Sequence, residues 1–321
     1  MDQPIALSNI DALGAHIRSG LIGRDALVER LLIGLLTGRH ILIEGAPGLG
    51  KTRAVKLLVS GLAPSFARVQ CTPDLMPADL TGTPIFRQDV GKFEFVEGPL
   101  FNSIILVDEI NRAPPKVQSA LLEAMAERQI TSGSTTYALP DPFVVFATQN
   151  PIEHEGTFPL PEAQLDRFLL HVVLDHPDAQ AEADILDLVV GEGAGGTPGL
   201  ETPLTADTII AAREAAMAVH LSPVLKDYIV RLVTGTRADS DATEIAGLIE
   251  HPASSRASIA LAAASKALAF LRGRDYAVPE DVQELAADAL AHRIVLKWRA
   301  TAEGETPRSV IGKLLETVRS V

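Results

Sequence analysis

The order of apolar and polar positions changes character partway along the chain. In the first half, short apolar runs of strand length alternate with stretches whose apolar residues recur at helical spacing. After a Gly-rich stretch at residues 191–199, only helical patterns follow. Alternating strands and helices favour a parallel sheet covered by helices on both faces. We therefore expect an α/β core over residues 1–178, a linker over 179–204 and an all-helical unit over 205–321.

Five apolar runs in the first half are expected to form the strands of this sheet. The third contains four apolar residues in succession, Ile104 to Val107, which indicates a central strand buried on both faces. Two pairs of short extended segments flank turn residues, and they predict hairpins near residues 83–97 and 129–142. The expected strands are residues 40–44, 66–71, 103–109, 143–150 and 168–174, and the expected helices of the second unit are residues 205–220, 223–235, 254–271, 279–298 and 307–318.

A glycine-rich segment directly follows the first expected strand. It reads Gly45-Ala46-Pro47-Gly48-Leu49-Gly50-Lys51-Thr52 and matches G-x-x-x-x-G-K-[ST], the phosphate-binding P-loop. Its glycines let backbone N–H groups turn towards phosphate oxygens, and the following helix start adds positive partial charge. Lys51 is expected to reach the β- and γ-phosphates, and the Thr52 hydroxyl to ligate Mg²⁺. A simple glycine-rich turn is the alternative, but the flanking strand and helix favour a nucleotide site.

Polar side chains end two of the later strands, where ligands bind in open α/β sheets. Asp108 and Glu109 end the third strand, and Asn150 ends the fourth. Asp108 is expected to hold Mg²⁺ beside Thr52, and Glu109 to orient and polarise the attacking water. Asn150 is expected to hydrogen-bond the γ-phosphate or that water. Without the P-loop, these residues would equally suit helix capping and a turn before Pro151. Behind a P-loop, a hydrolytic site is favoured.

The turn Leu21-Ile22-Gly23-Arg24-Asp25 lies between two expected helices, just ahead of the P-loop strand. Its two apolar side chains could pack against a nucleotide base, which makes Ile22 and Gly23 candidate base-binding residues. A plain helix–helix turn explains the same residues. The pattern leaves both interpretations open.

Composition narrows the classes of protein to consider. The 321 residues include 28 Lys and Arg against 41 Asp and Glu, a net charge of −13, which argues against a broad nucleic-acid surface. The single cysteine, Cys71, excludes an internal disulfide and a Cys-based zinc site. The sequence has no apolar run long enough for a membrane span, and its start lacks the basic and apolar regions of a secretory signal. We therefore expect a cytoplasmic protein.

The order of these features resembles that of AAA+ ATPases. The shared features are a P-loop, an acidic strand end, a polar strand end, an arginine before the fifth strand and a helical C-terminal unit. Within that class, three segments resemble the MoxR family. They are Asp108 to Met125, Ala147 to Pro151 and Leu160 to Phe168. The resemblance extends from near Leu21 to the C-terminus.

The resemblance implies a P-loop NTPase αβα sandwich with a parallel five-stranded sheet in the order 5-1-4-3-2. It also implies a C-terminal all-helical lid and assembly as a hexameric ring, with both hairpins facing the pore. Asn150 takes the sensor-1 role in this scheme.

Two arginines receive roles from the same resemblance. Arg256 matches the sensor-2 arginine on the lid, and Arg167 matches the finger that reaches the γ-phosphate of a neighbouring subunit. Arg112 is another candidate for that interface. The alternatives are an ion pair of Arg167 with Asp166 or Glu162 in its own chain, and simple solvation of Arg256 at a helix start.

The resemblance implies ATP and Mg²⁺ as cofactors and ATP hydrolysis as the reaction. It further implies chaperone-like remodelling or maturation of protein complexes, often with a partner that carries a von Willebrand factor A domain. A chelatase-type motor subunit for metal insertion and a helicase-like nucleic-acid motor are the alternatives. The first expected hairpin tip has Arg87 and Lys92 as its basic residues, which is little for tracking phosphates.

Overall fold

A parallel five-stranded sheet forms the centre of the molecule. The computed structural model describes residues 3–89, 91–151, 156–192, 200–240 and 242–320. The strands of the sheet are β1 (Ile41–Gly45), β2 (Phe66–Gln70), β5 (Ile104–Asp108), β8 (Val144–Gln149) and β9 (Leu170–Leu174). Their spatial order, β9-β1-β8-β5-β2, confirms the predicted order 5-1-4-3-2. All pairings are parallel, so the strands share a carboxyl edge, where they end, and an amino edge, where they begin.

Helices cover both faces of this sheet because successive side chains of a strand point to opposite sides. Ile104 and Leu106 of β5 belong to one apolar cluster, and Ile105 and Val107 belong to the other. All four side chains are fully buried, as predicted for a central strand. The first cluster packs under α1 (Gln3–Ser19), α2 (Asp25–Thr37) and α3 (Lys51–Ser60), and the second under α5 (Pro115–Glu127).

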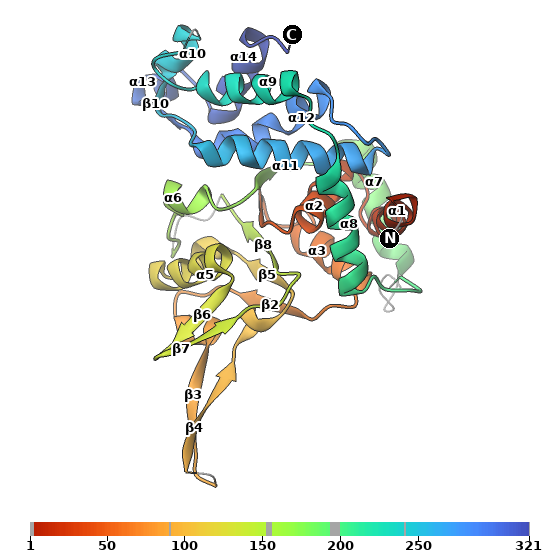
Figure 1. The fold of residues 1–321 in the computed structure, drawn as a ribbon, viewed down its shortest axis with the longest axis vertical. Coiled ribbons are helices and arrows are strands. Elements are labelled where there is room, and N and C mark those ends of the chain that lie inside the picture. Colours follow the sequence, from red (N-terminus) through yellow and green to blue (C-terminus); the bar gives the residue numbers. More distant parts are fainter. Residues whose placement is uncertain (1–2, 90, 152–155, 193–199, 241, 321) are drawn as a thin grey trace.

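Two hairpins leave the sheet at the predicted positions. The first pairs β3 (Gly82–Arg87) with β4 (Lys92–Glu97) and extends away from the body, and the second pairs β6 (Gln129–Ser132) with β7 (Thr135–Ala138) (Figure 1). Gly82 begins β3 with a φ of 93°, and a Cβ there would lie 2.2 Å from a carbonyl oxygen of β4. Only glycine fits at the base of this hairpin.

Aromatic side chains lie along the projecting hairpin. Phe86 and Phe93 meet edge to face with ring centroids 5.2 Å apart, and their exposed fractions are 50% and 73%. Arg87 forms an ion pair of 2.8 Å with Glu94 across the two strands. The hairpin therefore presents an apolar surface on which this basic residue is already neutralised.

The C-terminal part is helical, with one correction to the prediction. The expected helix over residues 279–298 ends at Leu290, and a 3₁₀ turn and a short strand follow it. That strand pairs antiparallel with an earlier one, and the turn directs Arg293 into the core. The elements are α8 (Ala206–Ala218), α9 (Pro223–Thr234), α10 (Thr243–Leu248), β10 (Ile249–His251), α11 (Ser255–Leu271), α12 (Pro279–Leu290), η4 (Ala291–Arg293), β11 (Val295–Leu296), α13 (Trp298–Ala302) and α14 (Pro307–Thr317).

Five further helical elements of the described chain, four of them short, join these parts. They are α4 (Pro77–Thr81), η1 (Pro99–Phe101), η2 (Ile110–Arg112), α6 (Glu162–Leu165) and α7 (Ala179–Glu192). The Gly-rich loop predicted over residues 191–199 lies mostly outside the described residues, which resume at residue 200. In the described parts of the chain, no helix has the length and apolar character needed to cross a membrane.

The sheet and the helical part share one apolar core. Helix α8 packs against α1 and α2, and α11 packs against α2 and α8. A single cluster of buried side chains runs from β1 and α2 through α8 and α11 to α14. The division at residues 178 and 205 therefore stays a prediction from sequence, because packing is continuous across it.

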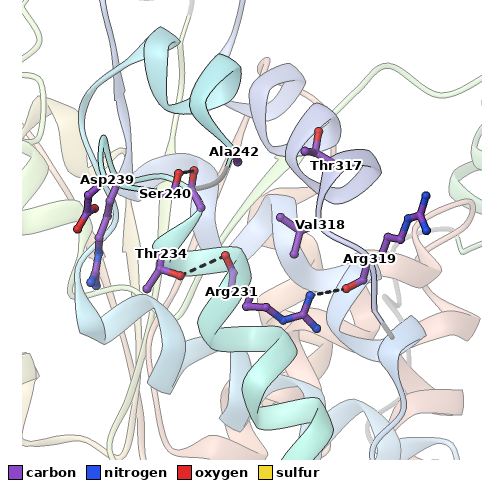
Figure 2. Close-up of a pocket in the computed structure, with 10 residues that line it drawn as sticks. Arg231, Thr234, Asp239, Ser240, Ala242, Thr317, Val318 and Arg319 are labelled. Atoms are coloured by element: carbon purple, nitrogen blue, oxygen red, sulfur yellow. Dashed lines mark hydrogen bonds between the residues drawn. The ribbon is translucent and has the colours of Figure 1, made fainter.

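A cavity of about 570 Å³ lies within the helical part, between the end of α9 and the end of α14. Arg231 donates to the Arg319 carbonyl oxygen at 2.8 Å, whereas the Arg319 side chain turns away from it (Figure 2). The charged groups that line this cavity do not converge on one point.

Candidate active site

The P-loop follows β1 and leads into α3, as the motif predicts. Gly48 and Gly50 have φ values of 84° and 80°, a region that favours glycine. Gly50 is the N-cap of α3, so the first N–H groups of the helix face the loop. The Lys51 ammonium donates to the carbonyl oxygens of Gly45 and Ala46, the latter at 2.9 Å. The loop therefore places an ammonium and a helix N-terminus at the carboxyl edge.

Asp108 lies beside this loop and is 3% exposed. Thr52 donates its hydroxyl to Asp108 Oδ1 at 2.9 Å, so the structure brings the two predicted metal ligands together. Thr148 donates to the same oxygen at 3.0 Å, and Arg68 Nε donates to Oδ2 at 2.8 Å. A buried carboxylate needs such partners, because an unpaired charge is costly away from water.

Glu109 follows Asp108 in a left-handed backbone conformation, with φ of 56°. Such a conformation is uncommon outside glycine and points the side chain off the strand direction. Its N–H donates to Thr148 Oγ1 at 2.9 Å. Its Oε2 accepts from Gln70 Nε2 at 3.0 Å and from an Arg112 guanidinium N–H at 3.2 Å. Among the described residues, Oε1 is left as the acceptor without a partner.

Arg68, Gln70 and Thr148 were not identified from the sequence. β2 runs parallel to β5 with Gln70 opposite Asp108, and this register brings the polar end of β2 to the acidic residues. The signal was the same one that marked Asp108, a polar residue at the carboxyl end of a strand. The same signal is present at Gln70, the last residue of β2.

Asn150 directly follows β8 and is 3% exposed. Its carbonyl oxygen accepts from Asn111 Nδ2 at 3.1 Å, which ties the end of β8 to the turn after Glu109. Since β8 neighbours both β1 and β5, Asn150 lies at the carboxyl edge between the P-loop and the acidic pair.

An apolar pocket of about 370 Å³ opens beside the P-loop. Ile22 lines it together with Leu21, and α7 contributes Ile185, Leu188 and Val189 on the other side. Gly23 is not among the lining residues. It has φ of 67°, and a Cβ there would lie 3.1 Å from Ala181 of α7, so its backbone suits the turn and the close approach of that helix, and its place in a base site stays a prediction. The contribution of α7 was missed because its residues were assigned to the linker.

Arg167 and Arg256 lie at the amino edge of the sheet, whereas Lys51 lies at the carboxyl edge, at the other end of the strands. Both line a pocket of about 260 Å³ together with Arg39 and Arg293, which we call the arginine pocket. Arg39 immediately precedes His40 and β1, whereas the P-loop follows β1. The five residues of β1 therefore separate Arg39 from the P-loop. At about 3.3 Å per residue, this separation is about 16 Å.

Asp166 holds two of these arginines. Its Oδ2 is 3.3 Å from the Arg256 guanidinium and accepts from Ser254 Oγ at 3.2 Å. Its Oδ1 accepts from Arg293 Nε at 2.8 Å, and burial lowers the pKa of Arg293 to about 10, which leaves it charged at neutral pH. Arg167 instead donates to the Leu122 carbonyl oxygen at 3.3 Å. The structure thus pairs Asp166 with Arg256 and Arg293.

Comparisons with known proteins define the class. The model of the family described as "ATPase family associated with various cellular activities (AAA)" matches residues 40–170, and the model of the AAA lid domain matches residues 241–314. A solved structure of a candidate ATPase from Cytophaga hutchinsonii superposes with a TM-score of 0.90 at 42% identity, covering 99% of this chain and 96% of the other. With its P-loop and acidic strand end, the chain is an AAA+ ATPase.

Relatives define the family within that class. Chaperone MoxR1 of Mycobacterium tuberculosis is 44% identical over 306 residues, which cover 94% of this chain and 80% of the relative. Protein MoxR of Methylorubrum extorquens is 32% identical over 304 residues, which cover 88% of this chain and 86% of the relative. The chain belongs to the MoxR family.

Proposed function

We propose that the protein hydrolyses Mg·ATP at sites shared between copies of the chain and uses this energy to remodel protein complexes. The observation that carries the proposal is the separation of two sets of residues. The P-loop, Asp108 and Glu109 lie at the carboxyl edge, whereas Arg167 and Arg256 lie at the amino edge. The length of β1 between them exceeds the length of an arginine side chain. The arginines of one copy therefore serve the nucleotide of another.

Phosphate binding falls to the P-loop. Backbone N–H groups of the loop and of the first turn of α3 supply donors, and the partial positive charge of the helix start favours an anion. Lys51 rests on two loop carbonyl oxygens and would exchange them for phosphate oxygens. Ile22 and the apolar face of α7 would hold the base in the neighbouring pocket.

Thr52 and Asp108 fit Mg²⁺. The ion prefers oxygen ligands and is usually held by one or two carboxylates together with substrate phosphates. The two side chains lie 2.9 Å apart at the end of the P-loop, so both would face an ion that accompanies the phosphates. When bound, Mg²⁺ neutralises phosphate charge.

Glu109 would orient the attacking water. One carboxylate oxygen is fixed by Gln70 and Arg112, and the other is left to accept a hydrogen bond from water. Because one oxygen is fixed, the position of the other is also set. Positioning of the reacting groups is a main contribution of a protein to phosphoryl transfer. Asn150, at the next strand end, would hydrogen-bond the γ-phosphate or the same water.

Contact between the carboxyl edge of one copy and the amino edge of the next is a head-to-tail interface. Such interfaces close into rings when the rotation between copies permits. A hexamer is the assembly that the family resemblance implies. In it, Arg167 and Arg256 would stabilise the charge on the phosphoryl group of the neighbour.

The projecting hairpin supports a role in handling proteins. Phe86 and Phe93 offer exposed aromatic surface, which suits apolar segments of a client chain. The chaperone name of the mycobacterial relative agrees with this role. The proposal also includes a partner protein with a von Willebrand factor A domain, as the family resemblance implies.

A nucleic-acid motor is less well supported. Arg87 near the hairpin tip is already paired with Glu94, so little free positive charge faces a backbone phosphate. Stimulation of hydrolysis by single-stranded DNA with a steep salt dependence would reverse this judgement.

Glu109→Gln tests the proposal. The variant is expected to bind ATP normally and to lose turnover by about 10²- to 10⁴-fold, since it keeps the size and hydrogen-bonding capacity but not the charge of the side chain. Nucleotide binding and phosphate release are measured, with Glu316→Gln on the exposed face of α14 as the matched control. The same variant, loaded with ATP, is used to retain a client in a pull-down. Near-normal hydrolysis by Glu109→Gln would remove Glu109 from the reaction.

A further inference from the structure

Arg39 occupies an unusual place at the amino edge. It lies between the end of α2 and β1, and it lines the arginine pocket beside Arg167 and Arg256. We propose that Arg39 is a further phosphate-binding residue of this pocket, acting with those two arginines on a phosphate group brought to the amino edge. Where that phosphate belongs to the nucleotide of a neighbouring copy, the assignment rests on the proposed function.

The other arginines around the pocket have partners. Arg128 donates to the Gly38 carbonyl oxygen at 2.9 Å, Arg167 to the Leu122 carbonyl oxygen, and Arg256 and Arg293 to Asp166. No described residue hydrogen-bonds or ion-pairs with the Arg39 guanidinium. Its five N–H donors are therefore available to a ligand.

Charge in the pocket favours an anion. Four arginines line it, and Asp166 is the single carboxylate among the lining residues that the structure describes. That carboxylate is already shared by Arg256 and Arg293. Desolvation, followed by the positive charge of Arg128, lowers the pKa of Arg39. An anion with more than one negative charge would relieve this repulsion, and guanidinium groups bind phosphate in a bidentate manner.

The backbone that carries Arg39 is fixed. Gly38 caps α2 in the left-handed conformation with φ of 61°, and its N–H bonds to carbonyl oxygens of that helix. The Arg39 N–H bonds to the Gly34 carbonyl oxygen at 3.2 Å. A Cβ on Gly38 would lie 2.6 Å from the Arg213 guanidinium, so the turn is also packed from outside. A fixed segment reduces the entropy lost when the side chain binds a ligand.

The first experiment measures hydrolysis. Arg39→Ala is expected to bind nucleotide at its own P-loop normally and to hydrolyse ATP roughly 10- to 100-fold more slowly, the effect of one lost charge-assisted hydrogen bond. Arg39→Lys keeps the charge without the planar fork and should lose less. Arg299→Ala, an exposed arginine on α13, is the matched control. Thermal unfolding of each variant separates a folding defect from a local one.

The second experiment identifies the source of the phosphate. Lys51→Ala subunits have a defective P-loop and an intact arginine pocket, whereas Arg39→Ala subunits have the reverse. If mixing them restores hydrolysis, the phosphate belongs to a neighbour's nucleotide. If mixing restores nothing but Lys51→Ala binds inorganic phosphate, and Arg39→Ala in that background abolishes the binding, the pocket takes free phosphate.

The outcomes separate the two proposals. If Arg39→Ala hydrolyses ATP like Arg299→Ala and leaves binding of inorganic phosphate unchanged, Arg39 is not a phosphate ligand. If Arg167→Ala and Lys51→Ala subunits fail to complement each other, the shared site of the proposed function is wrong. The phosphate titration still decides the role of Arg39 in that case.

Discussion

The two edges of the sheet differ in how their charged side chains are paired. At the carboxyl edge, Asp108 and Glu109 both receive hydrogen bonds from side chains of their own chain. At the amino edge, four arginines line the arginine pocket, and Asp166 is the single carboxylate among the lining residues that the structure describes. The two carboxylates of the carboxyl edge are therefore paired within one molecule, while the arginine pocket carries a surplus of positive charge. The arginine pocket therefore favours an anion from outside the chain, in addition to the anion site that the P-loop offers at the other edge.

The substitution Arg167→Ala tests the role of the amino edge and has the largest expected effect. We expect ATP binding to persist and turnover to fall by about 10³- to 10⁵-fold, the usual cost of losing an arginine finger. Glu109→Gln subunits keep Arg167 but cannot hydrolyse, so adding them should restore activity to Arg167→Ala subunits. Steady-state hydrolysis at several mixing ratios provides the measurement. Without such rescue, the finger must be another residue, and Arg112, the other candidate from the sequence, donates to Glu109 of its own chain in this structure.

The buried side chain of His40, next to Arg39, should make the free energy of unfolding depend on pH. Its Nδ1 accepts from the Val145 N–H at 3.0 Å and its Nε2 faces the Met125 carbonyl oxygen at 3.2 Å, so the neutral ring carries its hydrogen on Nε2. Burial lowers the pKa of His40 from 6.5 to about 4. The unfolded chain therefore binds more protons between these values, and stability is lost as the pH falls from 6.5 towards 4.

The loss should approach about 3 kcal/mol over that window. Urea unfolding midpoints at a series of pH values measure it. His40→Gln should be less stable at neutral pH and show a shallower pH dependence, whereas His251→Gln, at an exposed position, should follow the parent chain. Equal slopes for the parent and His40→Gln would show that His40 does not titrate in this way.

Arg68→Gln should give the smallest effect. The Arg68 guanidinium lies 2.8 Å from Asp108 and partly neutralises the carboxylate that would hold Mg²⁺. Removing this positive charge should tighten Mg²⁺ binding by about two- to fivefold, because Arg68 is 43% exposed and its field is screened. Mg²⁺ titrations followed by both nucleotide fluorescence and hydrolysis measure the change. Weaker Mg²⁺ binding would mean that Arg68 orients Asp108 and does not compete for it.

Local sequence was enough for features whose meaning depends on neighbours in the chain. The P-loop between a strand and a helix, and the apolar run before Asp108, are of this kind, since their secondary structure comes from consecutive residues. The strand order came from the family resemblance, which these motifs carried.

Contacts between distant residues could not be predicted in the same way. The register of β2 against β5 sets Gln70 beside Asp108, and no pattern within β2 alone indicates it. Asp166 meets Arg293 across 127 positions because a predicted helix stops early and η4 turns the side chain inward. Helix α7 looked like part of a linker, and its role at the pocket depends on packing against the turn at Gly23.

The continuous apolar core also limits where movement can occur. Because α8 and α11 pack onto α2 in one cluster with β1, separating lid from sheet would expose a large apolar surface to water. A hinge inside one copy would therefore be stiff. In the assembly proposed above, the seam between copies would then be the compliant joint, and movement would occur between subunits.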